Sequence, residues 1–476
     1  MAAPATTEKK TPIQEIIQPF KDLAHAPRAL WGINLSYFLE GMVYFGMLTY
    51  LAIHFSDYIF ANSHQPDVDS HHMVMVLTAG ITISMFFLGF LADKWGIRRT
   101  LLTAFCCLLT GRVLISLGPA LGLEVGMWNG LHLMTLAGIV VVVIGYGMYQ
   151  PAAYAGVKKF TGPKTAAMGF AMLYALMNLG GYFPSYAWYL RDNLGLGIPG
   201  TFWVYTGITA LALCFTFFIL TAKVEREAAQ RAQKEREEAA EAEGDAAPAE
   251  AAETPAAPER RLTFGEKTVN YFVNHPLRDL KFTFFIFALI PVQTLFTYNW
   301  LILPQYISRA YEGFIGDKYE FFSNLNPLLI FIAVPIVAAA TTKNKIYNLM
   351  LVGTFIMAAP AFFLAFGTNV YTLLGYLFVM TIGEAIWQPR FLQFAAEIAP
   401  EGRTGEYMGV AQLPWFLTKM LVPLYSGHMI QRFCPAEGAR DPERMWLYFG
   451  IIAMMSTVLL VVARGWAAKD FKAKAD

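Results

Sequence analysis

Long apolar segments, separated by shorter polar ones, make up most of the chain. The hydrocarbon core of a bilayer is ~30 Å thick, and a helix needs about 20 mostly apolar residues to span it. We count twelve such segments, at roughly residues 29–53, 73–92, 100–119, 131–157, 165–190, 201–221, 281–305, 321–342, 346–366, 369–396, 405–429 and 445–464. The pattern predicts an all-α membrane protein with twelve transmembrane helices.

The composition supports this prediction and excludes an ordinary soluble protein. Of the 476 residues, 56% are hydrophobic and 15% are charged, against about 25% charged in typical soluble domains. Residues 1–28 carry charges throughout and lack an apolar core, so we expect no cleavable signal peptide. The four cysteines lack metal-like spacing, and we expect them to pack as small core residues without disulfides: Cys106, Cys107, Cys214 and Cys434.

The distribution of Lys and Arg predicts the orientation in the membrane. Short cytoplasmic loops collect these residues. If the chain starts inside, the inner loops and tails hold 27 of the 36, and the outer loops hold six. We therefore expect a multi-pass protein of the cell membrane with both termini in the cytoplasm.

The segment between the sixth and seventh spans divides the chain into halves. Its first part is rich in strong helix formers, whereas its second part is rich in Ala, Glu and Pro and has little to bury. We expect a helical extension and then a flexible tether. The motifs "HAPRAL" before the first span and "HPLRDL" before the seventh also fit a duplicated fold, with two bundles and a pathway between them at mid-membrane depth.

These features predict five regions. They are a cytoplasmic segment at 1–28, a six-helix bundle at 29–221, a charged cytoplasmic linker at 222–280, a second six-helix bundle at 281–464 and a cytoplasmic tail at 465–476. An apolar stripe along residues 11–23 predicts an interfacial helix, and residues 262–277 are its possible equivalent in the second half.

The polar loop after the first span holds three histidines and three aspartates. The histidines are His64, His71 and His72. Their spacing fits no compact metal site, so we expect a solvated loop and no bound metal.

The loop "GFLADKWGIRRT", residues 89–100, joins the second and third spans. It resembles the signature loop of the major facilitator superfamily, in which a Gly, an Asp, a second Gly and a basic pair follow one another. An Asp in such a loop can accept bonds from Arg side chains or from a helix N-terminus, and the glycines permit the tight turn. The resemblance implies a conformational gate made by Gly89, Asp93, Gly96, Arg98 and Arg99.

The stretch "GFAMLYALMNLGG", residues 169–181, resembles the fifth-helix signature of the proton-dependent oligopeptide transporters. Small residues allow helices to approach closely in lipid, and interhelical hydrogen bonds hold them together. Asn178 lies one helical turn beyond Tyr174, so both offer polar groups on one face. These groups serve either another helix or the amides of a ligand, and the sequence leaves both readings open.

Other marks of that family are only partly kept. In "YFLEGMVYFG", residues 37–46, Glu40 and Tyr44 match, but Gly41 stands in place of the family's Arg. In "GYGMYQPAA", residues 145–153, Gln150 stands in place of its Lys, and the acid of the seventh helix would fall near Pro291. "NLNP" at 324–327 and "GEAIWQP" at 383–389 resemble motifs of the eighth and tenth helices. The protein therefore resembles a divergent relative of this family. The family's substrate cannot be assigned to it from the resemblance.

Glu40, Glu384 and Lys419 fall near the middle of predicted spans. A charge there costs roughly 2.5–3.5 kcal/mol on insertion scales, so each is a candidate functional residue. A carboxyl group takes up a proton on dehydration and releases it when a cation approaches. We expect Glu40 and Glu384 to couple transport to protons, and a Glu384–Lys419 pair to form and break. The alternative is that all three make fixed interhelical bonds.

The candidate substrate-binding residues combine these charges with nearby polar and aromatic side chains: Tyr44, Gln150, Tyr174, Asn178, Glu384, Trp387 and Lys419. Arg112 lies in the third span, which is peripheral in the resembling fold, and we expect a packing or headgroup role for it. Arg390 is placed to reach the cytoplasmic interface.

The expected fold is thus the major facilitator fold, two bundles of six transmembrane helices. We expect a secondary active transporter, a monomer coupled to protons, that moves a small polar solute such as a di- or tripeptide or an amino-acid-like compound. The alternatives are a transporter or exporter of a different solute, and a transport-dead receptor or adaptor. No nucleotide-binding motif and no assembled nucleophile and base are present, so we expect no cofactor, no nucleic-acid partner and no enzyme activity.

Overall fold

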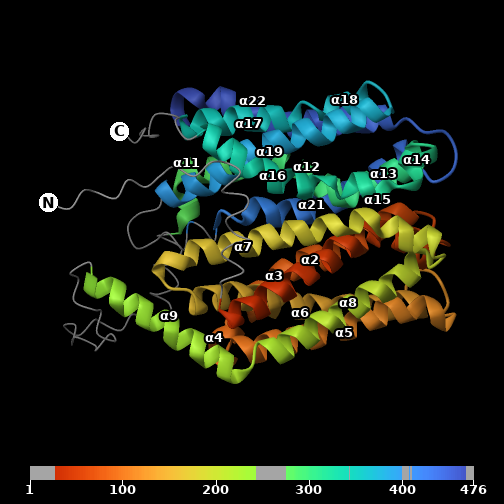
Figure 1. Cartoon of the computed structure of the whole chain (residues 1–476). Coiled ribbons are helices and arrows are strands. Elements are labelled where there is room, and N and C mark those ends of the chain that lie inside the picture. The colour runs from red at the N-terminus through yellow and green to blue at the C-terminus, as the bar shows by residue number, and fades with distance from the viewer. Residues whose placement is uncertain (1–26, 243–274, 342–343, 399–406, 408–409, 468–476) are drawn as a thin grey trace, which may run out of the picture.

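The structure, a computed structural model, describes residues 27–242, 275–341, 344–398, 407 and 410–467. The interfacial helix expected at 11–23, most of its possible equivalent at 262–277, the flexible tether and residues 468–476 of the tail lie outside the described residues. Within the described part, the helices form the two bundles that Figure 1 shows one above the other.

The first bundle is built from α2 (Arg28–His54), α3 (Pro66–Leu88), α5 (Ile97–Leu117), α6 (Gly130–Phe160), α7 (Pro163–Tyr182) and α8 (Gly197–Ile219). Short elements connect them: η1 (Phe55–Ile59), α4 (Leu91–Trp95), η2 (Gly118–Leu121), η3 (Phe183–Tyr186) and η4 (Tyr189–Asn193). Within the bundle, α5 packs on α6, α3 on α6, and α2 on both α7 and α8.

The second bundle follows the linker. It contains η5 (Pro276–Arg278), α11 (Leu280–Ala288), α12 (Ile290–Leu301), α13 (Leu303–Ala310), α14 (Gly313–Asp317), α15 (Tyr319–Ser323), α16 (Leu325–Thr341), α17 (Ile346–Ala358), α18 (Ala361–Ala365), α19 (Val370–Ile398), α21 (Leu413–Phe433) and α22 (Pro442–Ala467). Here α17 and α16 pack on α19, and α18 and α12 pack on α22. Contacts between α3 and α21 and between α7 and α16 join the bundles.

Where the structure describes them, the predicted spans coincide with helices or with consecutive helices. In the described part, nine helices are long and apolar enough to cross a membrane, and Tyr319–Val334 is a shorter apolar one. The all-α membrane fold is therefore confirmed, while the full count of twelve stays a prediction.

Several predicted spans are not continuous helices, and proline lies at the breaks in two of them. Residues 281–305 are divided into α11, α12 and the start of α13, and Pro291 and Pro304 lie in the first turns of α12 and α13. Proline lacks an N–H group and is tolerated in the first turn of a helix but not in its interior. Similarly, Pro360 separates α17 from α18. The prediction of single helices at 281–305 and 346–366 was wrong in this respect.

The loop expected to be solvated after the first span is largely helical and partly buried. Helix α3 begins at Pro66, so that Asp67 is 4% exposed and His71 is fully buried. The prediction was wrong because hydropathy measures the mean apolar character of a segment. It does not detect polar side chains that are paired inside the protein.

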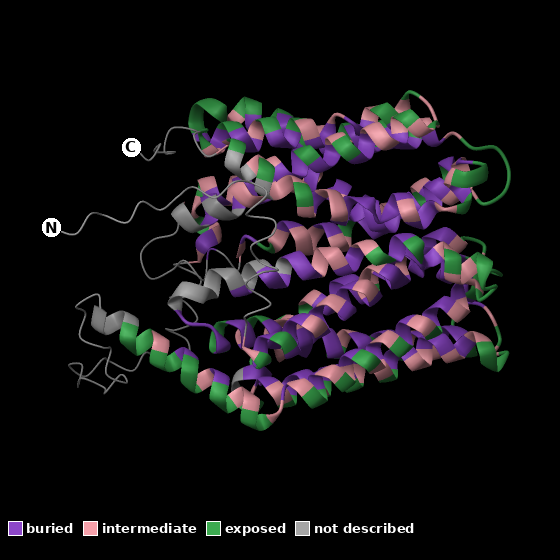
Figure 2. Cartoon of the chain, in the orientation of Figure 1, coloured by how far each residue is buried: buried purple, intermediate pink, exposed green. Residues whose placement is uncertain are grey.

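Large apolar side chains are exposed on the outer faces of both bundles. Phe86 is 83% exposed, Phe366 84% and Val462 79%. In Figure 2 exposed residues mark the outer edges of the two bundles, and buried residues predominate between them. Such exposure would be unfavourable in water, so these faces contact lipid. Cys106 and Cys214 are also exposed, which corrects their prediction as core residues, whereas Cys434 is buried.

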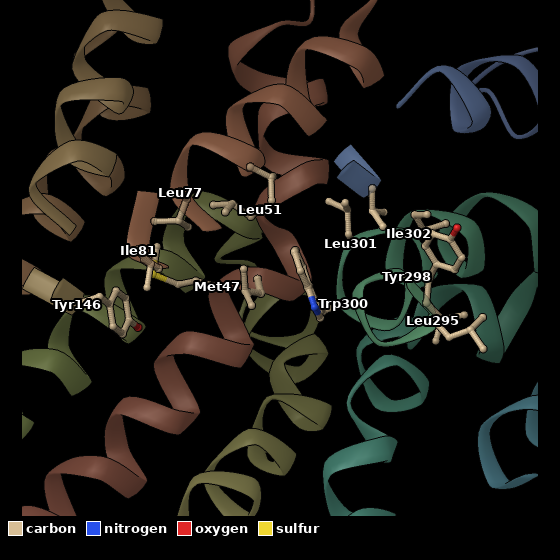
Figure 3. Packing of buried hydrophobic residues seen from close by; sticks show 14 of the residues in the cluster. Met47, Leu51, Leu77, Ile81, Tyr146, Leu295, Tyr298, Trp300, Leu301 and Ile302 are labelled. Atoms are coloured by element: carbon tan, nitrogen blue, oxygen red, sulfur yellow. The ribbon is translucent and has the colours of Figure 1, made fainter. Parts of the chain in front are cut away.

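Buried apolar side chains from both bundles also meet each other. Figure 3 shows Trp300 of α12 pointing toward Met47 of α2, with Leu301 and Ile302 following it in the chain. Trp300 is 8% exposed and Met47 7%. Apolar packing of this kind lacks the directional bonds that would lock one bundle on the other.

The first part of the linker is helix α9 (Ala222–Ala242), which confirms the predicted helical extension. It continues from α8 and lies against one end of the first bundle, at the lower left of Figure 1. We call this end of the molecule the α9 end. The other end, where α2 passes into η1, is called the opposite end.

The close approach of α5 to α6 depends on Gly111 and Gly138. A Cβ on Gly111 would lie 2.5 Å from the carbonyl oxygen of Gly138, and a Cβ on Gly138 would lie 2.7 Å from that of Gly111. Since neither backbone has room for a methyl group, we expect Gly111→Ala to destabilise the protein by about 1–3 kcal/mol. Gly207→Ala on α8, where nothing lies within 4 Å, should leave stability unchanged or slightly raised.

The measurement is the thermal unfolding midpoint of the purified protein in detergent. Equal midpoints for Gly111→Ala and Gly207→Ala would contradict this account of how α5 and α6 pack.

Candidate functional site

Glu40 of α2 lies in the centre of the first bundle, where it bonds to side chains of two other helices, α5 and α6. Its carboxylate and the guanidinium of Arg112 on α5 are both almost fully buried. Arg112 Nη1 donates to Glu40 Oε2 at 2.8 Å, and Nη2 donates to Oε1. The pairing is therefore bidentate, the strongest geometry for this type of ion pair.

Two hydroxyl groups complete this cluster. Arg112 Nη1 donates to Thr209 Oγ1 of α8 at 2.6 Å, and Nη2 donates to the hydroxyl oxygen of Tyr146 on α6 at 2.9 Å. The Tyr146 hydroxyl in turn donates to Glu40 Oε1. The cluster of Glu40, Arg112, Tyr146 and Thr209 thus connects α2, α5, α6 and α8 across the middle of the bundle.

The expected peripheral position of Arg112 was therefore wrong. A buried cation inside lipid needs an anionic partner. The sequence contains a signal for this pairing, because the Arg and Lys that would accompany Glu40 in the resembling family are both replaced, by Gly41 and Gln150. Arg112 is the intramembrane cation left in the first bundle to neutralise it.

Glu384 in α19 has a different environment. It is 4% exposed, and its Oε2 accepts a hydrogen bond from Asn326 Nδ2 of α16 at 3.0 Å. Asn326 also donates to Thr381 Oγ1 at 2.9 Å. The ion pairs among the described residues include none to Glu384. Its recorded partner is therefore a neutral amide, whereas Glu40 is held by a cation.

Lys419 lies on α21, the helix that packs against α3 of the other bundle. Its side chain is half-buried, and no ion pair between it and Glu384 is among the described contacts. Its backbone carbonyl accepts a bond from Thr78 Oγ1 of α3 at 3.4 Å. The structure thus presents a state in which the expected Glu384–Lys419 pair is not formed.

The remaining candidate substrate-binding residues are dispersed. Tyr44 is half-buried and packs edge-to-face on Tyr146 at 5.5 Å between ring centroids, beside the Glu40 cluster. Gln150 on α6 and Asn178 on α7 are half-buried. Tyr174 lies on α7, and its side chain is outside the described part of the structure.

The glycines after Asn178 have a clear structural function. A Cβ on Gly180 would lie 2.3 Å from the carbonyl oxygen of Phe38, and one on Gly181 would lie 2.6 Å from the Phe45 ring. The motif therefore allows α7 to pack closely on α2. The close helix approach expected from these small residues is therefore present, while the two readings of Tyr174 and Asn178 stay open.

Trp387 is buried inside the second bundle in this structure. It is 1% exposed, and its indole Nε1 donates to Met357 Sδ of α17 at 2.9 Å. A Cβ on Gly353 of α17 would lie 2.7 Å from Trp387 Cβ. The indole therefore has a packing role in this state, and a substrate contact stays a prediction.

The predicted gating loop forms a tight turn at the α9 end. Gly89 follows α3, and Gly96 has φ 84 and ψ 159, a conformation that favours glycine. The Arg98 guanidinium lies over the Phe217 ring at 5.3 Å, and Arg99 is exposed. The side chain of Asp93 is outside the described part of the structure, so the gating role stays a prediction.

Polar contacts between the bundles gather at the opposite end. Arg309 of α13 forms a bidentate pair with Asp67 of α3, with nitrogen to oxygen distances of 2.9 and 2.7 Å. Burial lowers the pKa of the Arg309 guanidinium, but the hydrogen bonds to Asp67 and its charge more than offset this, and the net direction is upward. The Arg309 guanidinium therefore stays charged near neutral pH.

A second polar group lies at the same end. Glu320 of α15 is fully buried, and its Oε1 accepts from Tyr50 of α2 at 2.7 Å and pairs with Arg191 Nε of η4 at 2.8 Å. His71 of α3 bonds through Nδ1 to Ser426 of α21 at 2.6 Å and through Nε2 to Gln305 of α13 at 2.8 Å. These contacts close the opposite end, and the sequence analysis missed them.

Within the described residues, the side-chain bonds recorded between the bundles lie at this end, except for the bond from Thr78 near the middle. Among the described residues, the recorded side-chain bonds therefore join the two bundles mainly at the opposite end.

Comparisons with known proteins agree with the fold. The family model described as "Major Facilitator Superfamily" matches residues 30–423. A solved structure of a peptide transporter POT in complex with sulfate is 18% identical, covers 93% of this chain and 95% of that chain, and has a TM-score of 0.68. A POT family transporter in complex with 5-aminolevulinic acid is 16% identical, covers 94% of this chain and 97% of that chain, and has a TM-score of 0.65. At these identities the likeness establishes the fold.

Among curated proteins, the uncharacterized MFS-type transporter YttB of Bacillus subtilis (strain 168) is 25% identical over 179 residues. The match covers 36% of this chain and 44% of that relative, so it spans less than half of the relative's length.

The Glu40–Arg112 pair should behave as a structural unit. Removing one partner leaves the other charge buried and alone, so we expect Glu40→Gln and Arg112→Gln each to destabilise the protein by about 3–5 kcal/mol. The double variant removes both charges, and its loss should be smaller than the sum of the two single losses. The measurement is a double-mutant cycle on unfolding in detergent, and additive losses would contradict the pairing.

Proposed function

The chain belongs to the major facilitator superfamily, and on that premise we propose that it is a proton-coupled secondary active transporter that works by alternating access. It is a multi-pass membrane transporter. The proposal extends to its solute, a small polar molecule such as a di- or tripeptide or an amino-acid-like compound. It also places the protein in the cell membrane, with the α9 end in the cytoplasm.

The observation that carries the proposal is the environment of Glu384. A buried carboxyl group with a neutral amide partner can exist with or without its proton at modest cost, because Asn326 can bond to either form. Glu40 is instead held in a bidentate ion pair with Arg112. We therefore assign proton uptake to Glu384 and a fixed structural role to Glu40.

Lys419 fits the role of a solute contact. It lies on α21, which faces the first bundle through α3, and it belongs to none of the described ion pairs. A solute carboxylate would neutralise its charge on binding. Half-buried Gln150 and Asn178 on the first bundle, with Tyr44 and Tyr174, would supply hydrogen bonds to amide groups of the solute.

The bonds recorded between the bundles at the opposite end support the proposal of alternating access. The state described here is closed at the opposite end by the Asp67–Arg309 and Glu320–Arg191 contacts. For solute to reach the site from that side, these bonds must be exchanged for contacts with water. The apolar surfaces of the two bundles around Trp300 can then move past each other without breaking hydrogen bonds or ion pairs.

A second candidate function is transport or export of a different, non-peptide solute. The observation that favours it is the commitment of Arg112 to Glu40, together with Gln150 at the position of the family's Lys. The first bundle then offers amides and hydroxyls, rather than a cation, to the solute.

The test is uptake of a mixed di- and tripeptide pool into proteoliposomes, with and without an inward proton gradient. Wild type should accumulate peptide only with the gradient. Glu384→Gln should lose accumulation by at least about tenfold, because an amide cannot carry a proton. It should keep exchange of peptide without a gradient, which needs no net proton movement. Glu312→Gln, which changes an exposed carboxylate in the same way, is the matched control and should resemble wild type.

Two results would overturn different parts of the proposal. Undiminished accumulation by Glu384→Gln would remove Glu384 as the proton site. A lack of peptide transport in wild type, with active uptake of another solute in an unbiased screen, would favour the second candidate function.

A further inference from the structure

A groove of about 390 Å³ lies at the α9 end, where α2 begins and α8 passes into α9. It is formed by two stretches that are far apart in the sequence, residues 27–29 and 221–231. Its lining residues are Pro27, Arg28, Ala29, Thr221, Lys223, Val224, Glu227, Ala228 and Arg231. Neither the candidate transport site nor the gating loop includes it.

The groove is positively charged. It combines the cations Arg28, Lys223 and Arg231 with one carboxylate, Glu227. Lys223 and Glu227 are 3.7 Å apart, and their side chains are 82% and 60% exposed. Arg231 pairs at 3.1 Å with Glu235, which is not among the lining residues. Exposed pairs of this kind contribute little to stability, so an incoming anion can replace them.

Aromatic residues place the groove at the level of the lipid headgroups. Trp31, one turn into α2 from Arg28, is 38% exposed, and Phe218 in the last turn of α8 is 66% exposed. Aromatic side chains exposed in this way gather at the membrane interface. Beyond Thr221 the chain changes abruptly from the apolar α8 to the charged α9. Lys223 and Arg231 therefore lie on the charged side of this change, and Phe218 lies on the apolar side.

We infer that this groove binds the phosphate-bearing headgroup of an anionic phospholipid from the adjacent leaflet. Basic pockets beside membrane helices on the cytoplasmic side recognise such headgroups. The two Arg side chains can each donate a pair of N–H groups to phosphate oxygens, and Lys223 adds a third positive charge. The acyl chains would continue along the exposed faces of Trp31 and Phe218.

A lipid held here would connect two parts of the molecule. Arg28 opens α2, the helix of Glu40, and Lys223 and Arg231 belong to α9. Two turns of α9 are already attached to the first bundle. Glu225 Oε1 accepts from the Ile97 backbone N–H at 3.3 Å, beside the gating loop, and Arg236 donates to the Thr161 carbonyl at 3.0 Å. Helices α2 and α9 already pack on each other, and among the described residues no hydrogen bond or ion pair between them is recorded. The headgroup would supply such a link.

The test uses the full chain purified in detergent and titrated with phosphatidylglycerol, with phosphatidylcholine of the same acyl chains as the neutral lipid. The readouts are the thermal unfolding midpoint and lipid retained in native mass spectrometry. Wild type should bind phosphatidylglycerol saturably and phosphatidylcholine much more weakly. The variant Lys223→Gln/Arg231→Gln should lose about thirtyfold in apparent affinity, since each basic residue near an anionic headgroup contributes about fivefold.

The matched control is Arg226→Gln/Lys234→Gln. It removes the same two residue types from exposed positions of α9 outside the groove. It should bind phosphatidylglycerol within about twofold of wild type, because these side chains do not line the site. Both variants should have the wild-type unfolding midpoint without lipid, which separates loss of binding from loss of folding.

Two outcomes would overturn the inference. Equal losses in the groove variant and the control would mean that α9 is a diffuse basic surface without a site. Displacement of phosphatidylglycerol by millimolar inorganic phosphate, with equal stabilisation by phosphate alone, would mean that a free anion and not a lipid is the ligand.

Discussion

A charged side chain inside a membrane protein is shielded from water and needs a partner of opposite charge. The Glu40–Arg112 pair meets this requirement in the first bundle. Neither group can be solvated where it lies, so each requires the other, and Tyr146 and Thr209 satisfy further hydrogen-bonding positions. Because the four residues come from four helices, the electrostatic requirement also fixes how those helices are arranged. The first bundle is thereby expected to move as a unit.

The second bundle uses its buried carboxyl group differently. Glu384 accepts a hydrogen bond from the amide of Asn326. The ion pair expected between Glu384 and Lys419 is not among the described ion pairs. A site that must change its charge during a cycle cannot be locked in a bidentate ion pair. The proposed function thus assigns a rigid scaffold to the first bundle and proton exchange to the second. Exchangeable polar contacts at the opposite end join them.

Hydropathy predicted most of the fold, because a lipid-spanning helix needs a long apolar segment whatever its neighbours are. It could not predict which helix face meets lipid and which meets protein, since both surroundings are apolar, and so Cys106 and Cys214 were misplaced. It also missed Asp67 and His71, which are buried by pairing with distant residues. The composition of a segment does not show that its polar residues will pair with residues more than 200 positions away in the chain.

The candidate residues Glu40 and Glu384 could be predicted because a charged residue within a long apolar segment is unusual. The different roles assigned to them follow from their partners, which only the folded structure reveals.

The central claim is that Glu384, and not Glu40, changes its protonation state. Infrared difference spectroscopy on the reconstituted protein, titrated through the pH range of transport, reports directly on the carbonyl stretch of a protonated carboxyl group. The account predicts a titrating band that disappears in Glu384→Gln and persists in the Glu40→Gln/Arg112→Gln double variant. A band that persists in Glu384→Gln and disappears when Glu40 is replaced would contradict it.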